Sequence, residues 1–293
     1  MKYYLENEFL SLTFDTLGAT LTSIKNPLGV EYLWHGDPAY WSSQAPVLFP
    51  ICGSLRDDQA VTRDGREMKM PRHGLVRKRE FEFANKDWNM VAFKIRSTPD
   101  LLEAYPYEFE LTIEYRLIGK EIVVNYFIKN RSPVDMPFAI GGHPGFNCPI
   151  NEDENFEDCY IEFEHEESCT VPAPLSETGL IDAKQRSPFL NNQTVLPLSR
   201  DMFKEDAIIL DRIRSRKVSL KSYKSENSVT VTFKDFPFLI LWSSPNEGPF
   251  FAIEPWSGLS TCEHESDIFE EKVNTQIVKP GHINKYSYSI IIG

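Results

Sequence analysis

The sequence predicts a nearly all-β protein whose 293 residues form one domain. Apolar and polar residues alternate in short runs from one end of the chain to the other, as in half-buried strands. The helical period is weak throughout, and 20 prolines would interrupt long helices. Neither a Gly/Ser/Pro-rich linker nor a repeat of about 20–50 residues divides the chain. We therefore expect residues 1–293 to form a single domain, without a propeller or βαβ architecture.

The strands of the first half are predicted from alternation and from turn composition. Residues 10–14 alternate between apolar and polar side chains, and the segment 26–29 (NPLG) is typical of a turn. Apolar side chains recur at every second position over residues 109–117 and again over 122–128, with Gly119 and Lys120 between the two runs. Two alternating runs joined by a glycine-containing turn predict a β-hairpin.

The second half continues the same pattern. Alternation over residues 159–163, 229–233 and 286–292 predicts three more strands. The run 250–253 (FFAI) is apolar at consecutive positions, which is typical of a strand buried on both faces. The segment 266–272 is a candidate for a short helix, so we expect few and short helices.

Composition indicates a large core and an acidic surface. Hydrophobic residues make up 41% of the chain, well above the range of disordered proteins, and 43 acidic against 31 basic residues give a net charge of -12. The electrostatic field of a protein with this negative charge repels phosphate backbones and anionic lipid surfaces. We therefore expect neither a nucleic-acid partner nor a membrane partner. An anionic small molecule remains compatible, because local residues set the field inside a cleft.

The cysteines and the N-terminal residues indicate a reducing compartment. The five cysteines are odd in number, widely spaced and without a Cys-x-x-Cys pair, which is typical of reduced thiols. Acidic residues at positions 6 and 8 interrupt the apolar stretch that a signal peptide needs, and no apolar run reaches the roughly 18 residues of a membrane span. We therefore expect a soluble, cytoplasmic protein.

Three segments place titratable side chains among glycines, prolines and aromatic residues, where a β-scaffold presents loops or strand ends. They are 71–77 (PRHGLVR), 141–146 (GGHPGF) and 250–256 (FFAIEPW). Glu254 in the third segment ends an apolar strand, where a carboxylate is costly unless it is paired or used. Each signal has an ordinary alternative, because a histidine between glycines is often a turn residue and such a glutamate often meets an arginine. The other four histidines lie outside these segments.

Metal and nucleotide sites are not predicted. The segment 262–265 (CEHE) has metal-ligand residue types but lacks a second cluster at zinc-site spacing, and the acidic segment 151–158 lacks the glycine that a calcium loop requires. No Gly-x-Gly-x-x-Gly or phosphate-loop sequence occurs. We expect no cofactor.

Taken in order, the segments resemble the aldose 1-epimerase family, in particular its LacX-like branch, over essentially the whole chain. The matching segments are 17–24 (LGATLTSI), 31–34 (EYLW), 49–56 (FPICGSLR), 73–74 (HG), the His143 segment and 254–256 (EPW). The resemblance implies a large β-sandwich of the galactose mutarotase-like type, whose concave sheet binds a hexose.

The resemblance also implies roles for individual residues. Glu254 would take the proton of the C1 hydroxyl as base, and His143 would protonate the ring oxygen as acid. It suggests His73, Arg56 and Asp206 as ligands of the sugar. General acid and base acting together open a pyranose ring without metal, cofactor or covalent intermediate, each contributing about 10²–10⁴-fold.

The segment 53–56 (GSLR) departs from galactose mutarotases, whereas the segment 73–77 (HGLVR) is similar to hexose-6-phosphate epimerases. Arg72 and Arg77 could therefore meet a phosphate, although exposed surface arginines are an equal alternative. The motif around His143 also differs from galactose mutarotases, so galactose is not singled out as the substrate. The expected function is thus anomer interconversion of a hexose or, alternatively, of a hexose 6-phosphate. A non-catalytic sugar-binding protein and, after it, a glycoside hydrolase are the rival interpretations, and the oligomeric state is left open.

Overall fold

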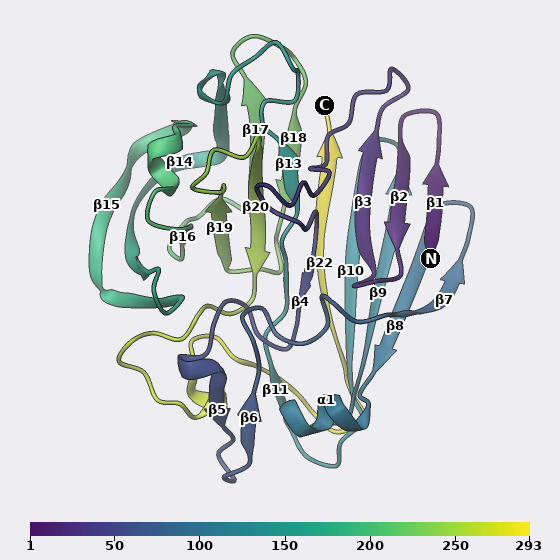
Figure 1. Ribbon diagram of the computed structural model, residues 1–293, viewed down its shortest axis with the longest axis vertical. Helices are drawn as coiled ribbons and strands as arrows, with labels where there is room; N and C mark the ends of the chain where they lie inside the picture. The colour runs from purple at the N-terminus through teal and green to yellow at the C-terminus, as the bar shows by residue number, and fades with distance from the viewer.

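The computed structural model describes residues 1–293 and confirms that the chain is mostly β, with antiparallel strands as its main regular structure (Figure 1). In order, strands β1 to β22 are Lys2–Glu6, Ser11–Asp15, Thr20–Lys25, Val47–Leu48, Gln59–Val61, Glu67–Lys69, Glu82–Lys86, Met90–Arg96, Phe109–Ile118, Glu121–Asn130, Met136–Phe138, Gly141–Gly142, Gly145–Asn147, Cys159–Leu175, Leu180–Pro197, Ile208–Leu210, Lys217–Ser222, Val229–Thr232, Phe238–Trp242, Phe250–Trp256, Gln276–Val278 and Ile283–Ile292. The helices are α1 (Pro99–Ala104) and the 3₁₀ turns Arg56–Asp58, Phe156–Asp158, Arg200–Phe203 and Phe269–Glu271.

The largest sheet has nine strands in the order β15-β14-β17-β18-β22-β10-β9-β8-β7. It contains the predicted hairpin, in which β9 and β10 pair from Ile118 opposite Glu121 to Phe109 opposite Asn130. Along β9, residues at every second position are buried, so one face of this sheet points into the core. The strands predicted at residues 159–163, 229–233 and 286–292 all lie in the same sheet.

The core lies between this sheet and the sheets that cover it. A three-stranded sheet, β1-β2-β3, packs on it through Phe14 and Tyr115, whose ring centroids are 4.7 Å apart. Phe49, next to β4, meets Phe109 of β9 at 5.0 Å. One continuous cluster of 65 buried residues joins the sheets.

A six-stranded sheet, β16-β19-β20-β12-β4 with β13 paired to β20, carries two different faces. Phe251 and Ile253 of β20 belong to the main core, whereas Trp256 belongs to a smaller cluster on the other face. Because side chains alternate across a strand, Glu254 points to the same side as Trp256, away from the main core. This second face is where a site can form.

The helices are shorter than expected. The candidate segment 266–272 forms only the single 3₁₀ turn Phe269–Glu271, and α1 was not predicted. Helix α1 buries only Leu101, so a six-residue helix with one buried side chain shows no helical period in the sequence. No helix is both long and apolar enough to cross a membrane. All five cysteines are free thiols.

Candidate active site

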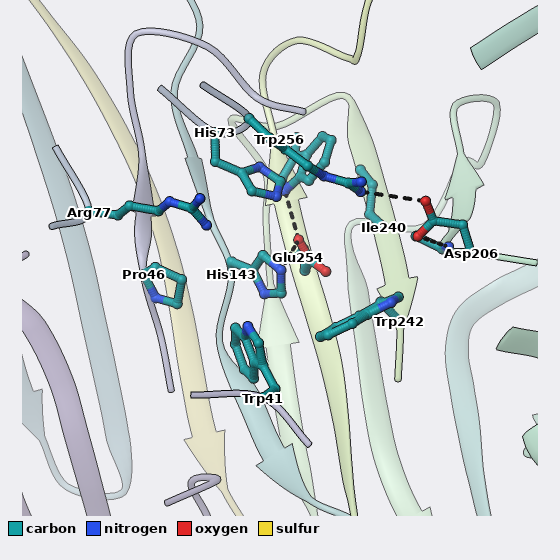
Figure 2. A pocket seen from close by; sticks show the side chains of 12 residues that line it. Trp41, Pro46, His73, Arg77, His143, Asp206, Ile240, Trp242, Glu254 and Trp256 are labelled. Atoms are coloured by element: carbon teal, nitrogen blue, oxygen red, sulfur yellow. Dashed lines mark hydrogen bonds and ion pairs between the residues drawn. The ribbon is translucent and has the colours of Figure 1, made fainter. Parts of the chain in front are cut away.

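A pocket of about 230 Å³ lies on the outer face of β19 and β20 (Figure 2). Its lining residues are Trp41, Pro46, Arg72, His73, Arg77, His143, Asp206, Ala207, Ile240, Trp242, Glu254 and Trp256. The register of β19 and β20 places Ile240 opposite Glu254, so neighbouring side chains of the two strands form the floor. Loops from distant parts of the chain supply the remaining walls.

Glu254 lies in the middle of the floor and is only 1% exposed. The indole Nε1–H of Trp256 donates to its Oε2 at 3.1 Å, while Oε1 has no hydrogen-bond partner in the protein. Burial raises the pKa of Glu254 well above its usual value, and the positive charge of Arg72 offsets only part of this effect. Burial therefore favours the protonated, neutral form of this carboxyl.

His143 follows β12 and lies directly beside this carboxyl. Its Nε2 is 3.3 Å from Oε2 of Glu254, and its backbone N–H donates to the carbonyl of Pro46 at 3.1 Å. Burial lowers the pKa of His143 to about 3, and the nearby charges of Arg72 and Arg77 act in the same direction. The buried Nδ1 has no partner. Glu254 and His143 thus form one closely coupled acid–base pair.

Glycines flank His143 for steric reasons. A Cβ atom on Gly142 would lie 2.8 Å from the hydroxyl of Tyr288, and one on Gly145 would lie 2.7 Å from the ring of Trp41. Neither distance leaves room for a side chain, so the segment 141–146 is glycine-rich because other side chains approach its backbone. The motif noticed in the sequence therefore reflects how closely His143 is enclosed.

A column of aromatic rings supports His143 from below. Trp41 stacks on His143 with centroids 4.7 Å apart, Phe250 stacks on Trp41 at 5.3 Å, and Trp34 stacks on Phe250 at 5.0 Å. His143 and Phe250 make no ring contact with each other, which indicates that they occupy opposite faces of Trp41. Trp41 therefore presents its edge to the pocket and orients His143.

His73 is fixed as a hydrogen-bond donor. The backbone N–H of Gly53 donates to its Nδ1 at 3.2 Å, and the backbone N–H of His73 donates to the Gly53 carbonyl at 2.7 Å. Burial lowers the pKa of His73 well below its usual value, so the ring is neutral. Because Nδ1 accepts a hydrogen bond, the single ring proton is on Nε2.

Charged residues mark two sides of the pocket (Figure 2). Asp206 accepts a hydrogen bond from the N–H of Ala207 on one side, and its Oδ2 lies 3.6 Å from the Arg72 guanidinium. Arg77 lies on the other side near Pro46, half-buried and with no hydrogen bond or ion pair from its guanidinium. The sites predicted at Glu254, His143, His73 and Asp206 are thus brought together with both arginines.

Arg56 is not part of this pocket. Its guanidinium donates to Asp267 at 3.1 Å and to the backbone carbonyls of Glu263 and Glu265 at 2.9 and 3.1 Å. With these donors used by the protein, Arg56 holds the loop after β20 and has little left for a ligand. We therefore leave it out of the proposed site, contrary to what the resemblance suggested.

No local pattern in the sequence pointed to the remaining pocket residues. Trp242 and Ile240 belong to an apolar run in β19, and their place beside Glu254 depends on strand register. Phe146, the last residue of the segment 141–146, is buried in the core. The one group of three side chains with metal-binding atoms close together, Asp182, Glu263 and His264, is largely exposed and lies outside the pocket.

Comparisons with known proteins agree with this geometry. A family model described as aldose 1-epimerase matches residues 1–266. The chain is 48% identical to the plasmid-encoded Protein LacX of Lactococcus lactis subsp. lactis, over 100% of this chain and 99% of that protein. The chromosomal Protein LacX of the same organism is equally similar.

Solved structures give the same result. A galactose mutarotase related enzyme from Lactobacillus acidophilus matches with a TM-score of 0.94 and 31% identity, over 100% of this chain and 97% of that one. A galactose mutarotase-like protein from Lactobacillus casei matches with a TM-score of 0.92 and 26% identity, over 100% of both chains. This protein therefore has the galactose mutarotase-like fold and belongs to the aldose 1-epimerase family of carbohydrate isomerases.

Proposed function

We propose that this protein interconverts the α and β anomers of a hexose, with Glu254 as base and His143 as acid. The observation that carries the proposal is the 3.3 Å contact between Nε2 of His143 and Oε2 of Glu254 on the floor of the pocket. Ring opening removes a proton from O1 and delivers one to O5. Both oxygens are bonded to C1, so the groups that serve them must lie side by side, as these two do.

Glu254 and His143 together hold one proton. The residue that carries this proton decides whether the pair can open the ring or close it. Burial favours the neutral form of both groups, so it places this proton on Glu254. Moving this proton to His143 gives a carboxylate and an imidazolium, the state needed to open the ring. After opening, the carboxyl again holds a proton and the imidazole is neutral, the state needed to close the ring on either face.

Other pocket residues orient the sugar. Neutral His73 offers its Nε2–H to a sugar oxygen and cannot compete with His143 as an acid. Asp206 accepts hydrogen bonds from hydroxyls, with Arg72 beside it. The unpaired Oε1 of Glu254 is the oxygen free to take the O1 proton.

A hexose 6-phosphate is the second candidate substrate. Arg77 favours it, since this half-buried guanidinium lacks any carboxylate partner and burial lowers its pKa. A phosphate would supply the missing negative charge. A glycoside hydrolase would need Asp206 as its second carboxylate, and that carboxylate already faces Arg72.

The test is anomer interconversion of freshly dissolved α-D-glucose, α-D-galactose and glucose 6-phosphate, followed by polarimetry or NMR. We expect acceleration of at least one sugar by the wild type and its loss in Glu254→Gln. Acceleration of the phosphate alone selects the second candidate. Sugar binding without acceleration of any of the three would leave a non-catalytic binding protein, and release of reducing sugar from an aryl glycoside would indicate a hydrolase.

A further inference from the structure

His73 depends on one backbone turn for its orientation. The residue lines the catalytic pocket (Figure 2), and its backbone has a φ of 70°, a value that residues other than glycine rarely adopt. It exchanges two hydrogen bonds with Gly53, at 2.7 and 3.2 Å, and its ring forms no other hydrogen bond within the protein. The position of Gly53 therefore decides which ring nitrogen of His73 offers a proton to the sugar.

Ser260 holds the turn Gly53–Ser54 from the side opposite His73. The backbone N–H of Ser54 donates to the hydroxyl oxygen of Ser260 at 3.1 Å, and the backbone N–H of Thr261 donates to the Ser54 carbonyl at 2.9 Å. A Cβ atom on Gly53 would collide with the same hydroxyl oxygen, so this hydroxyl lies directly against the Gly53 backbone. Both serines are buried. The turn is thus enclosed between His73 and Ser260.

Ser260 lies in the loop that follows β20, the strand that carries Glu254. In the same loop the hydroxyl of Ser257 accepts a hydrogen bond at 2.8 Å from the backbone N–H of Ile140, which precedes the His143 segment. One continuous stretch, residues 254–260, therefore supplies the base itself and supports the segments that carry the two pocket histidines. Ser260 gives this support from outside the pocket lining.

We propose that Ser260 is a positioning residue, whose hydroxyl fixes the turn Gly53–Ser54 so that His73 meets the sugar as an Nε2–H donor. The proposal rests on the proposed function, in which His73 orients the sugar. Without this hydroxyl the N–H of Ser54 loses its acceptor, and the turn no longer holds the N–H of Gly53 against Nδ1 of His73. The ring is then free to carry its proton on Nδ1, which leaves Nε2 as an acceptor.

The first experiment observes the His73 ring directly. NMR spectra of the imidazole nitrogens in isotope-labelled protein distinguish the two neutral forms from the imidazolium, and the His73 signals are those missing in His73→Gln. We expect the Nε2–H form alone in the wild type and a substantial share of the Nδ1–H form in Ser260→Ala. Ser260→Cys fills the same space with a weak acceptor and gives the same test if the alanine variant does not fold.

Ser132→Ala is the matched control for the loss of a buried hydroxyl. Ser132 is also buried, and its hydroxyl also accepts a backbone N–H, that of Glu108 at 2.6 Å, but it lies outside the pocket. Its removal should leave the His73 spectrum unchanged. A His73 ring that keeps the Nε2–H form in Ser260→Ala, or that changes equally in Ser132→Ala, overturns the proposal.

Kinetics then separate an effect through His73 from any other route. Ser260→Ala should raise KM by about two- to tenfold, the effect of one net hydrogen bond, and should change kcat little. In the His73→Gln background the same substitution should not raise KM further, and a second rise of equal size would overturn the proposal. A wild type that exchanges no sugar would reject the proposed function. A changed ring form in Ser260→Ala would then still support Ser260 as the residue that holds His73.

Discussion

Two buried glutamates, Glu254 and Glu167, show how the same residue serves two purposes in this molecule. Both are at most 2% exposed. Glu167 accepts hydrogen bonds from the backbone N–H groups of Arg214 and Ser215 and from the Ser215 hydroxyl, at 2.6–3.1 Å. Glu254 accepts one hydrogen bond, from Trp256, and its Oε2 also contacts Nε2 of His143. Its Oε1 has no hydrogen-bond partner in the protein.

The difference in hydrogen bonding between Glu167 and Glu254 indicates where a ligand is expected. A buried carboxylate whose acceptor sites are filled by the protein stabilises the fold, and one whose sites are left open at a pocket is available for chemistry. Two arginines show the same contrast. The guanidinium of Arg56 donates hydrogen bonds to one carboxylate and to backbone carbonyls, whereas that of Arg77 donates none within the protein. Open hydrogen-bonding capacity, rather than residue type, separates the pocket from the scaffold.

The largest expected effect comes from exchanging the two glutamates for glutamine. Glu254→Gln should lower kcat for anomer exchange by about 10²–10⁴-fold and leave the free energy of unfolding close to that of the wild type, because glutamine resembles the protonated carboxyl. Glu167→Gln should do the reverse, with kcat retained and about 1–3 kcal/mol of stability lost. Exchange rates and urea unfolding measure the two effects.

Glu226→Gln, an exposed position without partners, is the control for both glutamate variants. Equal losses of stability in Glu254→Gln and Glu167→Gln would remove the distinction between them.

The arginine pair gives the next largest effect. Arg56→Gln should destabilise the protein by about 0.5–1.5 kcal/mol, because its hydrogen bonds to Asp267 and to the carbonyls of Glu263 and Glu265 are lost, and should leave KM unchanged. Arg77→Gln should raise KM for glucose 6-phosphate by about tenfold, because the phosphate loses its cationic partner, with KM for glucose and stability kept. A raised KM in Arg56→Gln at unchanged stability would contradict the placement of that residue outside the site.

A smaller effect is expected at Trp41. Trp41→Leu removes the ring that orients His143 and should lower kcat by roughly tenfold, in line with a loss of about 1–1.5 kcal/mol for an aromatic contact. Trp41→Phe keeps a ring and should recover most of the rate. Trp34→Leu, at the far end of the same column, is the control, and an effect on kcat as large as that of Trp41→Leu would indicate general loosening of the column.

The weakest effect is the pH dependence of stability. Burial lowers the pKa of His143 from 6.5 to about 3, so its contribution is lost as pH falls through this range. Burial raises the pKa of Glu254 above 4.5, so its contribution is lost as pH rises through the folded-state value. Above pH 4.5 the unfolded pair holds one proton, on His143, and the folded pair holds one, on Glu254, for as long as the pH stays below the folded-state pKa of Glu254. Over that range, up to pH 6.5, the two slopes cancel.

The measurement is the difference in unfolding free energy between the wild type and the variant carrying both Glu254→Gln and His143→Asn. It should be flat between pH 4.5 and 6.5 and should decline on both sides by at most about 1.4 kcal/mol per pH unit. A difference that rises between pH 4.5 and 6.5 and is flat above pH 6.5 would mean that Glu254 is ionised in the folded protein.

Local pattern was sufficient for much of the fold. The hairpin of β9 and β10 follows from alternation on either side of Gly119, and the burial of β20 follows from its consecutive apolar residues. The short α1 was missed because it buries one side chain. Which strands neighbour each other across the sheets depends on long-range pairing that no local window contains.

The site was predictable only in part for the same reason. Glu254, His143 and His73 lie in segments whose glycines and prolines stand out locally. Arg56 lies in a similar segment, yet a backbone turn directs its guanidinium to the loop after β20. Trp242 reaches the pocket only through the register of β19 against β20, and the neutral Nε2–H form of His73 depends on Gly53 twenty residues away.

The decisive measurement is a double-mutant cycle on the catalytic pair. NMR exchange rates at saturating sugar are compared for the wild type, Glu254→Gln, His143→Asn and the double variant. If the two residues act as one unit, the double variant should be about as slow as the slower single variant. Losses that multiply, so that each residue contributes independently, would contradict a shared proton and the mechanism built on it.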